Sequence, residues 1–343
     1  MITAEDRAAV DAVLASGWIA QGPAVAALEA DFVRRYGGGG ACALSSGSAA
    51  LFLALKSLGA GEGATVAVPS YACSALLNAV YLAGATPKVV DVLPDSFCLD
   101  PAALARQAAE AAFAIAVHTY GAPADVAALQ APGRQLIEDC CQSLGGVGVQ
   151  GQLGSQGEAA VFSFYATKIV TGGQGGLVWS KAADVAEAVR YYRQFDCRES
   201  YVPRFNLQMT DIQAALVNSQ LARLEAIRSR RQAIARSYLA ALPAGLSVQS
   251  GLADAGRMAY RFVVLAPDLA TREALRRHME QAGVGCAVPI ERYELLHRYL
   301  KLDPADFPVA ERLADTSLSL PIHPGLSDAQ LAQAAAALSG FRP

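Results

Sequence analysis

A lysine and an aspartate each follow an apolar run of the sequence and could perform chemistry together. Lys168 follows the β-prone run 159–164 and precedes a glycine cluster at 172–176, whereas Asp139 ends the run that begins at 135. A lysine amine forms a Schiff base with an aldehyde, and pyridoxal phosphate sites pair such a lysine with an acid at the pyridine nitrogen. A single lysine in a glycine-rich loop is more often a solvated surface residue, so the prediction depends on companion motifs.

A turn of small residues is one such motif. Residues 46–50 read Ser-Gly-Ser-Ala-Ala and lead into a predicted helix over 49–58. Free backbone N–H groups at a helix N-terminus suit a phosphate. Ser163, which precedes Lys168, could add its hydroxyl to the same phosphate cup. The alternative is that Ser48 simply caps the helix.

The segment around Asp139 supplies the ring contacts. A carboxylate at the carboxyl end of a strand can keep the pyridine nitrogen protonated, and Gln142 could reach the phenolic oxygen of the ring. Asp139 could instead cap a following helix. The adjacent Cys140 and Cys141 are interpreted as small packing residues, and no metal site is predicted.

The elements that must position these residues alternate along the chain. Predicted strands cover 41–44, 65–69, 87–92, 113–117, 135–138 and 159–164, and predicted helices cover 3–16, 25–36, 49–58, 72–83, 101–111 and 126–130. Such alternation predicts an α/β fold with a mainly parallel sheet, helices on both faces, and functional residues beyond the carboxyl ends of the strands.

The C-terminal third has a different pattern. Residues 211–242 predict one long helix whose basic run 228–231 is a solvated face. A smaller α+β unit is predicted to follow, with strands 261–265 and 284–288 and helices 271–282 and 328–338. The chain is therefore expected to divide into a large domain, 1–240, that binds pyridoxal phosphate, and a small C-terminal domain, 241–343.

Composition narrows the class of protein. The 343 residues are 53% hydrophobic and carry a net charge of −3 without long runs of one sign, which argues against nucleic acid or a membrane as a partner. The N-terminus lacks the pattern of a signal peptide, and the seven cysteines show no C-x-x-C pair. We expect a cytoplasmic enzyme with reduced thiols.

Taken together, these motifs resemble the DegT/DnrJ/EryC1/StrS family of pyridoxal phosphate-dependent sugar aminotransferases over nearly the whole chain. The matching segments are Ser46 to Leu51 (S-G-T-A-A-L in the family), His118 to Gly121 (H-x-Y-G), Glu138 to Gln142 (E-D-x-x-Q), Ser163 to Lys168 (S-F-x-x-x-K) and Asn206 to Ala215. The resemblance implies the aspartate aminotransferase type of fold (fold type I) with a mostly parallel sheet in the large domain.

The resemblance also implies roles for single residues. Lys168 would form the internal aldimine and shuttle the proton, Asp139 would pair with the pyridine nitrogen, and Gln142 would bond the ring hydroxyl. The phosphate would be held by Ser48 and the Ala49 backbone.

Two further phosphate ligands are implied, Ser163 from the same chain and Asn206 from the other subunit. The resemblance therefore implies a homodimer with shared active sites.

Three positions depart from the family pattern. Cys73 stands where an aromatic ring commonly stacks on the cofactor, although Tyr71 could compensate if the turn is shifted. Gln174 replaces a frequent acidic residue. Leu207 and Gln208 replace a frequent Tyr-Arg pair, which leaves the substrate preference open.

Other residues have two interpretations each. His118 could contact the cofactor edge or be structural, and Trp18 could line a sugar site or belong to the core. Tyr165, Tyr293 and His297 are candidate pocket residues.

The expected reaction is transfer of an amino group from an amino acid, L-glutamate by family habit, to a keto-sugar linked to a nucleotide, with ping-pong kinetics. One alternative is a pyridoxal phosphate aminotransferase acting on another ketone, such as a cyclitol or a small precursor. The other is a non-catalytic sensor with the same fold, which retention of Lys168 disfavours.

Overall fold

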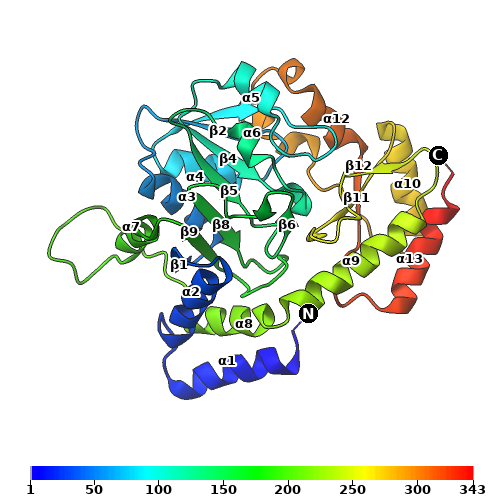
Figure 1. The fold of residues 1–343 in the computed structure, drawn as a ribbon. Helices are drawn as coiled ribbons and strands as arrows, with labels where there is room; N and C mark the ends of the chain where they lie inside the picture. Colours follow the sequence, from blue (N-terminus) through cyan, green and yellow to red (C-terminus); the bar gives the residue numbers. More distant parts are fainter. Residues whose placement is uncertain (1, 343) are drawn as a thin grey trace.

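The computed structural model describes residues 2–342, and its centre is a seven-stranded sheet (Figure 1). The strand order is β1-β9-β8-β5-β4-β2-β3. Only β9 runs against its neighbours; the remaining strands are parallel to one another. The strands are β1 (Gly40–Leu44), β2 (Thr65–Pro69), β3 (Thr86–Val90), β4 (Phe113–Val117), β5 (Gln135–Asp139), β8 (Ala159–Ser163) and β9 (Gly176–Ser180). The predicted α/β fold with a mostly parallel sheet is confirmed.

Both faces of this sheet are covered, which explains why its strands are continuous apolar runs. In β4, Phe113, Ile115 and Val117 belong to one hydrophobic cluster, whereas Ala114 and Ala116 belong to another on the opposite face. The covering helices are α2 (Pro23–Arg35), α3 (Gly47–Ser57), α4 (Ala75–Leu82), α5 (Pro101–Gln107), α6 (Val126–Leu129) and α7 (Ala183–Arg193).

A second, smaller sheet lies at the right of Figure 1 and has a hydrophobic cluster of its own. Its order is β10-β11-β12, all antiparallel: β10 (Ser247–Val248), β11 (Phe262–Leu265) and β12 (Ser317–Leu320). The helices beside it are α9 (Leu224–Ala240), α10 (Leu269–Gln281) and α13 (Asp328–Gly340). This second cluster begins at Ile234 on α9, whereas residues between 295 and 314 join the first cluster. The division of the chain at residue 240 stays a prediction.

The remaining elements connect these parts. They are α1 (Ala4–Ser16), α8 (Asp211–Leu221), α11 (Leu296–Tyr299), α12 (Pro308–Thr316), the strands β6 (Val147–Gly148) and β7 (Gly151–Gln152), and the short 3-10 helices Thr119–Gly121, Arg292–Glu294 and Pro304–Asp306. Thr3 caps α1 in a capping box with Asp6. Within residues 2–342, no helix is both long and apolar enough to cross a membrane.

The single helix predicted over 211–242 is wrong, because the chain breaks between α8 and α9. Ala222 and Arg223 separate the two helices. The helices have different neighbours: α8 packs against α1 and α2, whereas α9 packs against α13. One straight helix would not satisfy both sets of contacts.

Two further expectations in this region are also wrong. Residues 284–288 do not form a strand; Ala287 alone makes a bridge, to Ser319, because Gly285 and Pro289 limit the ladder. Arg231 of the basic run is buried rather than solvated, and its guanidinium donates to the carbonyl oxygens of Ala259, Tyr260 and Ile322.

Candidate active site

Six of the eight predicted site residues meet at the carboxyl ends of the parallel strands, as expected for this type of sheet. One cavity of 220 Å³ lies there. Its lining includes Ser48, Cys73, Asp139, Gln142, Ser163 and Lys168, together with Ser46, Gly47, Cys141, Tyr165 and Gln174. Two predicted residues, Ala49 and Asn206, are not among the lining residues.

The first turn of α3 forms one end of this cavity. Ser46 is the N-cap, and its hydroxyl accepts a hydrogen bond from the Ala49 N–H at 3.1 Å. The alternative that Ser48 caps the helix is therefore wrong. The Ser48 side chain is exposed and makes no hydrogen bond within residues 2–342, so its hydroxyl is free for a ligand. A phosphate would have to share the Ala49 N–H with Ser46.

Ser163 approaches the same helix start because residue 47 is a glycine. A Cβ at Gly47 would lie 2.8 Å from the Ser163 Cβ and 3.1 Å from its hydroxyl oxygen, closer than such contacts allow. A Cβ at Gly176 would lie 2.2 Å from the Ser46 carbonyl oxygen. The result is a narrow cradle of hydroxyl and N–H donors at the positive end of a helix, which fits a phosphate group.

Asp139 offers a hydrogen-bond acceptor to the cavity, whereas Gln142 offers a donor. Asp139 is buried, and its Oδ1 accepts the Cys141 N–H at 2.9 Å, so this carboxylate caps a turn rather than a helix. The Gln142 Oε1 accepts the Tyr120 N–H at 2.8 Å. That bond leaves the amide NH₂ of Gln142 as a free donor. An acceptor for a pyridinium N–H and a donor for a ring oxygen fit a pyridoxal ring.

Lys168 lies where it can reach both this cavity and a second one. Burial by itself lowers the pKa of the Lys168 amine, but the electrostatic effect of Cys141, Tyr260 and Asp139 outweighs it and raises the pKa above the ordinary value. Lys168 is therefore protonated at neutral pH.

The second cavity has a volume of 210 Å³ and shares Lys168, Cys73 and Gln142 with the first. Its other lining residues include Tyr120, Tyr260, Arg261, Ile290, Glu294 and Tyr299. Tyr260, Arg261 and Glu294 escaped the sequence analysis, since they belong to no local motif and reach the site only through the packing of the second sheet. Lys168 thus lies between a cavity that fits the cofactor and one that is open to a substrate.

Cys73 is an exposed thiol on the wall common to both cavities. Tyr71 does not compensate for the missing aromatic ring. It is fully buried, and its hydroxyl is 3.0 Å from the Ser317 hydroxyl. The expectation that Tyr71 could stack on the cofactor is wrong, because the ring is a core residue.

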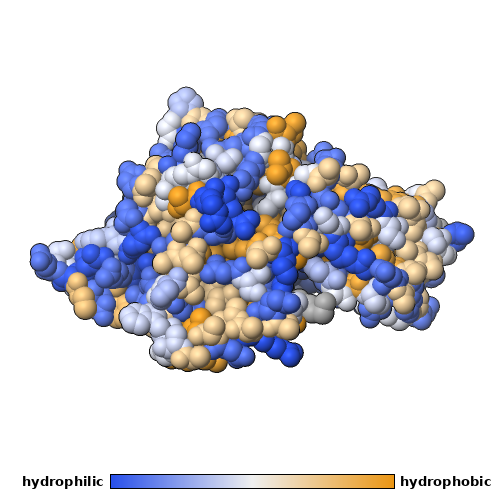
Figure 2. Space-filling model, turned by 60° about the horizontal axis from the view of Figure 1, so that its bottom comes forward, coloured by the Kyte–Doolittle hydropathy of each residue, from blue (hydrophilic) through white to orange (hydrophobic). Residues whose placement is uncertain are grey.

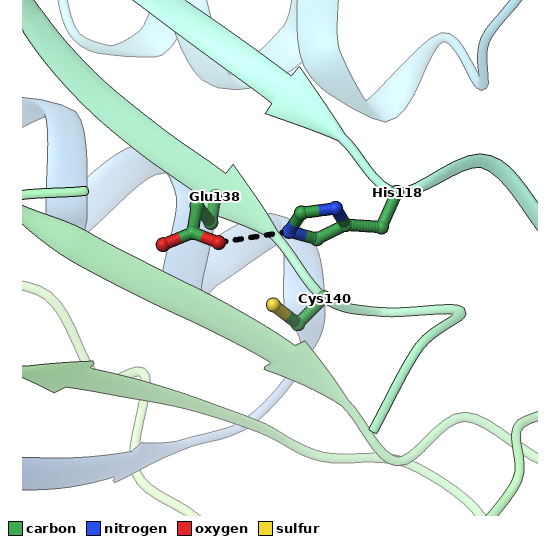
Figure 3. A group of neighbouring side chains, drawn as sticks. All are labelled: His118, Glu138 and Cys140. Atoms are coloured by element: carbon green, nitrogen blue, oxygen red, sulfur yellow. Dashed lines mark hydrogen bonds and ion pairs between the residues drawn. The ribbon is translucent and has the colours of Figure 1, made fainter. Parts of the chain in front are cut away.

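His118, Glu138 and Cys140 form a buried group with metal-ligand chemistry (Figure 3). The His118 Nδ1 accepts the Ala124 N–H at 3.0 Å, so the ring proton is on Nε2, which lies 2.9 Å from the Glu138 carboxylate. Glu138 also accepts backbone N–H bonds from Gly154, Gln156 and Gly157. These bonds occupy the ligand atoms of His118 and Glu138, so we interpret the group as structural. His118 does not contact the cofactor cavity.

Of the four other candidate pocket residues, only Tyr165 lines one of the two cavities. Trp18 is 61% exposed and donates its ring N–H to the Gln21 carbonyl, so it is not a core residue. His297 is buried between Ser70 and Glu311, at 2.6 and 2.8 Å, and is structural. Tyr165 lines the first cavity, whereas Tyr293 is exposed outside both.

Asn206 lies on the loop between α7 and α8, which projects away from the sheet in Figure 1. Its side chain is exposed and lies outside both cavities of its own chain. The neighbouring Phe205 packs edge-on against Phe52 of α3, and the Leu207 carbonyl accepts the Ser45 N–H at 2.8 Å. The backbone around Asn206 is thus held to the chain while the side chain faces outward.

Comparison with known proteins places the chain in one family. The model of the DegT/DnrJ/EryC1/StrS aminotransferase family matches residues 1–339. The chain is 35% identical to the erythromycin biosynthesis sensory transduction protein EryC1 of Saccharopolyspora erythraea, over 92% of this chain and 89% of that protein. It is 30% identical to the spore coat polysaccharide biosynthesis protein SpsC of Bacillus subtilis, over 96% of this chain and 92% of that protein.

Solved structures agree. DesV from S. venezuelae, crystallised with a ketimine intermediate, is 32% identical with a TM-score of 0.89, over 98% of this chain and 94% of that chain. The aminotransferase TlmJ from Streptoalloteichus hindustanus is 29% identical with a TM-score of 0.88, over 98% of this chain and 95% of that chain. The chain therefore belongs to the DegT/DnrJ/EryC1/StrS aminotransferase family and is a pyridoxal phosphate-dependent aminotransferase of fold type I.

Proposed function

We propose that this aminotransferase moves an amino group from an amino acid, with L-glutamate as donor, to a keto-sugar linked to a nucleotide. The observation that carries the proposal is the position of Lys168 between two cavities. One of them offers a phosphate cradle, a ring acid and an amide donor. The relationship to a polysaccharide biosynthesis protein supports a sugar acceptor.

Four side chains of the first cavity have a proposed binding role. Ser48 and Ser163 hold the phosphate, with help from the Ala49 backbone. Asp139 accepts the pyridine N–H, and Gln142 donates to the ring hydroxyl. Pyridoxal phosphate, when bound, supplies an aldehyde that takes up the amino group and a ring that accepts an electron pair.

Lys168 is the proposed general base and acid. It lines both cavities, so its Nζ could take a proton from the α-carbon of a donor held in the second cavity and later give a proton back to the substrate side. Because donor and acceptor use the same cavity in turn, the kinetics should be ping-pong.

We infer that the active unit is a homodimer. Asn206 faces outward from its own chain and would reach the phosphate in the other subunit. Trp18, Phe195 and Tyr201 are exposed apolar side chains at 61%, 45% and 91%. Figure 2 shows orange apolar residues exposed among blue hydrophilic ones on one face. We expect these three side chains to lie at the subunit interface of the proposed homodimer.

The test is the visible absorption of the purified protein with pyridoxal phosphate, before and after addition of L-glutamate. A yellow protein that glutamate bleaches, with release of 2-oxoglutarate, would support the cofactor role of Lys168 and the donor. A yellow protein that glutamate leaves unchanged would contradict glutamate as donor. No colour at all would contradict the role of Lys168.

A second candidate acceptor is a ketone without a nucleotide, such as a cyclitol or a small precursor. Leu207 and Gln208 stand where relatives frequently have Tyr-Arg, so a cation beside Asn206 is missing. A panel of nucleotide-linked and free ketones, offered to the glutamate-treated enzyme, separates the two candidates by which one restores the yellow colour.

A further inference from the structure

Arg261 brings an uncompensated positive charge into the second cavity. It precedes β11 and lines that cavity together with Lys168 and Glu294. Within residues 2–342 its guanidinium makes one hydrogen bond, from Nη1 to the Ser319 hydroxyl at 3.2 Å, and no ion pair. The remaining N–H groups of Arg261 have no partner among the described residues, so they are available to an anionic ligand.

Two aromatic rings hold the guanidinium in place. Its central carbon lies 5.6 Å from the centroid of the Tyr120 ring and 5.9 Å from that of Tyr260. Cation–π contacts of this length position an arginine without using its N–H groups. Tyr120 is buried, so this side of the support is rigid.

The same Tyr260 ring connects Arg261 to the reacting amine. The Lys168 Nζ lies 5.5 Å from the Tyr260 centroid, so two cations lie within 6 Å of one ring. A small molecule whose amine replaces that of Lys168 would bring its neighbouring groups toward Arg261.

Other charges in this region cannot bind an anion equally well. Glu294, on the cavity wall, repels a carboxylate. Arg231 lines a neighbouring cavity together with Arg261, but its guanidinium donates to backbone carbonyl oxygens. Arg292 and Arg298 pair with Glu311.

We propose that Arg261 binds the carboxylate adjacent to the reacting amine of the amino donor. This inference rests on the proposed function, because an amino acid must be the donor. A carboxylate and a guanidinium form two parallel hydrogen bonds, which would orient the α-carbon toward Lys168. Arg261 is thus a substrate-binding residue of the donor half-reaction.

The experiment compares Arg261→Met and Arg261→Lys with the wild type and with Arg312→Met. Arg312 is exposed on α12 and outside the cavities, so it controls for loss of one arginine. The first measurement is calorimetric binding of glutarate, a dicarboxylate without an amine, to each cofactor-loaded protein. The second is the glutamate concentration that half-saturates bleaching.

We expect Arg261→Met to lower the affinity for glutarate, and to raise the half-saturating glutamate concentration, by about 10- to 100-fold each. Arg261→Lys should recover part of the loss, and Arg312→Met should change neither quantity. Wild-type glutarate affinity in a folded Arg261→Met protein would overturn the proposal. So would a normal half-saturation with glutamate combined with weaker binding of the keto acceptor, since the anion would then belong to the acceptor.

Failure of the proposed function gives a different result. In that case no amino acid bleaches the wild type itself, so the result does not depend on the Arg261 variants. Retention of the yellow colour and of the melting temperature in each variant shows that the fold and the cofactor site are intact.

Discussion

Burial lowers the pKa of the Lys168 amine, but the electrostatic effects of Cys141, Tyr260 and Asp139 raise it above the ordinary value, so the amine is protonated at neutral pH. The protonated amine does not attack an aldehyde, so only the deprotonated fraction reacts. That fraction grows as the pH rises toward the pKa. Among the residues that raise this pKa, Cys141 and Asp139 line the cofactor cavity, whereas Tyr260 lines the second cavity.

This charge state predicts how the apoprotein takes up its cofactor. We expect the rate at which colour develops with pyridoxal phosphate to increase with pH until it levels off above the pKa of Lys168. Asp139→Asn removes one of the groups that raise the pKa and should move the rise to lower pH. Stopped-flow absorption over a pH series measures both proteins. An identical pH profile in the two would contradict the coupling.

Asp139→Asn should also slow transamination by about 10- to 100-fold, the effect of losing a hydrogen bond to a charged group. The amide cannot keep the pyridine nitrogen protonated. Asp11→Asn, on the exposed face of α1, is the matched control. Steady-state turnover with glutamate measures the effect, and circular dichroism checks the fold. A variant with the wild-type rate would exclude the proposed role of Asp139.

At the scale of elements, the start of α3 separates stability from binding. Ser46 caps the helix through its hydroxyl, whereas the Ser48 hydroxyl is exposed to the cavity and is not bonded within the described chain. Two serines in one turn therefore have different tasks, and the sequence alone did not distinguish them.

Ser46→Ala should reduce the free energy of unfolding of the apoprotein by about 1 kcal/mol, because a helix N–H loses its acceptor. Ser48→Ala should leave the stability unchanged but weaken binding of pyridoxal phosphate. Urea denaturation and fluorescence titration with the cofactor measure the two effects. Equal stability loss in both variants would show that Ser48 has a capping role after all.

The contact between His297 of α11 and Glu311 of α12 should make the stability of the protein sensitive to acid. Burial is the main cause that lowers the pKa of His297, and the pKa of Glu311 is lowered by Arg298 and His297 despite its desolvation. Groups with a lowered folded-state pKa contribute stability that is lost as the pH falls through that pKa. We expect the melting temperature to fall on acidification, and to fall less in His297→Gln; an equal fall in both proteins would contradict this cause.

For the whole molecule, shared active sites predict complementation. A Lys168→Ala subunit lacks the reacting amine, and an Asn206→Ala subunit lacks the ligand that it would give to its partner. In a mixed dimer one site carries both defects and the other carries none. We expect each variant alone to have little activity. After the two variants are unfolded and refolded together in equal amounts, about a quarter of the sites should be intact. No recovery of activity would argue against exchange of Asn206 between subunits.

The parts of the fold that follow from local patterns were predictable. Continuous apolar runs gave Thr65–Pro69 and Phe113–Val117 at the observed boundaries, because a sheet covered on both faces needs apolar residues throughout. The break at Ala222 and Arg223 was not predictable, since neither residue disfavours a helix and only the neighbouring helices require it. Tyr260 and Arg261 were missed for the same reason: their position beside Lys168 depends on how the second sheet packs.

The Arg231 guanidinium ties the carbonyl groups of Ala259, Tyr260 and Ile322 to α9. Because Tyr260 and Arg261 belong to the same stretch of chain, the substrate-side wall of the cavity is fastened to that helix. We expect wall and helix to move as one rigid body whenever the cavity opens. We therefore expect the chain to bend at Ala222 and Arg223, where α8 and α9 are interrupted, rather than within α9.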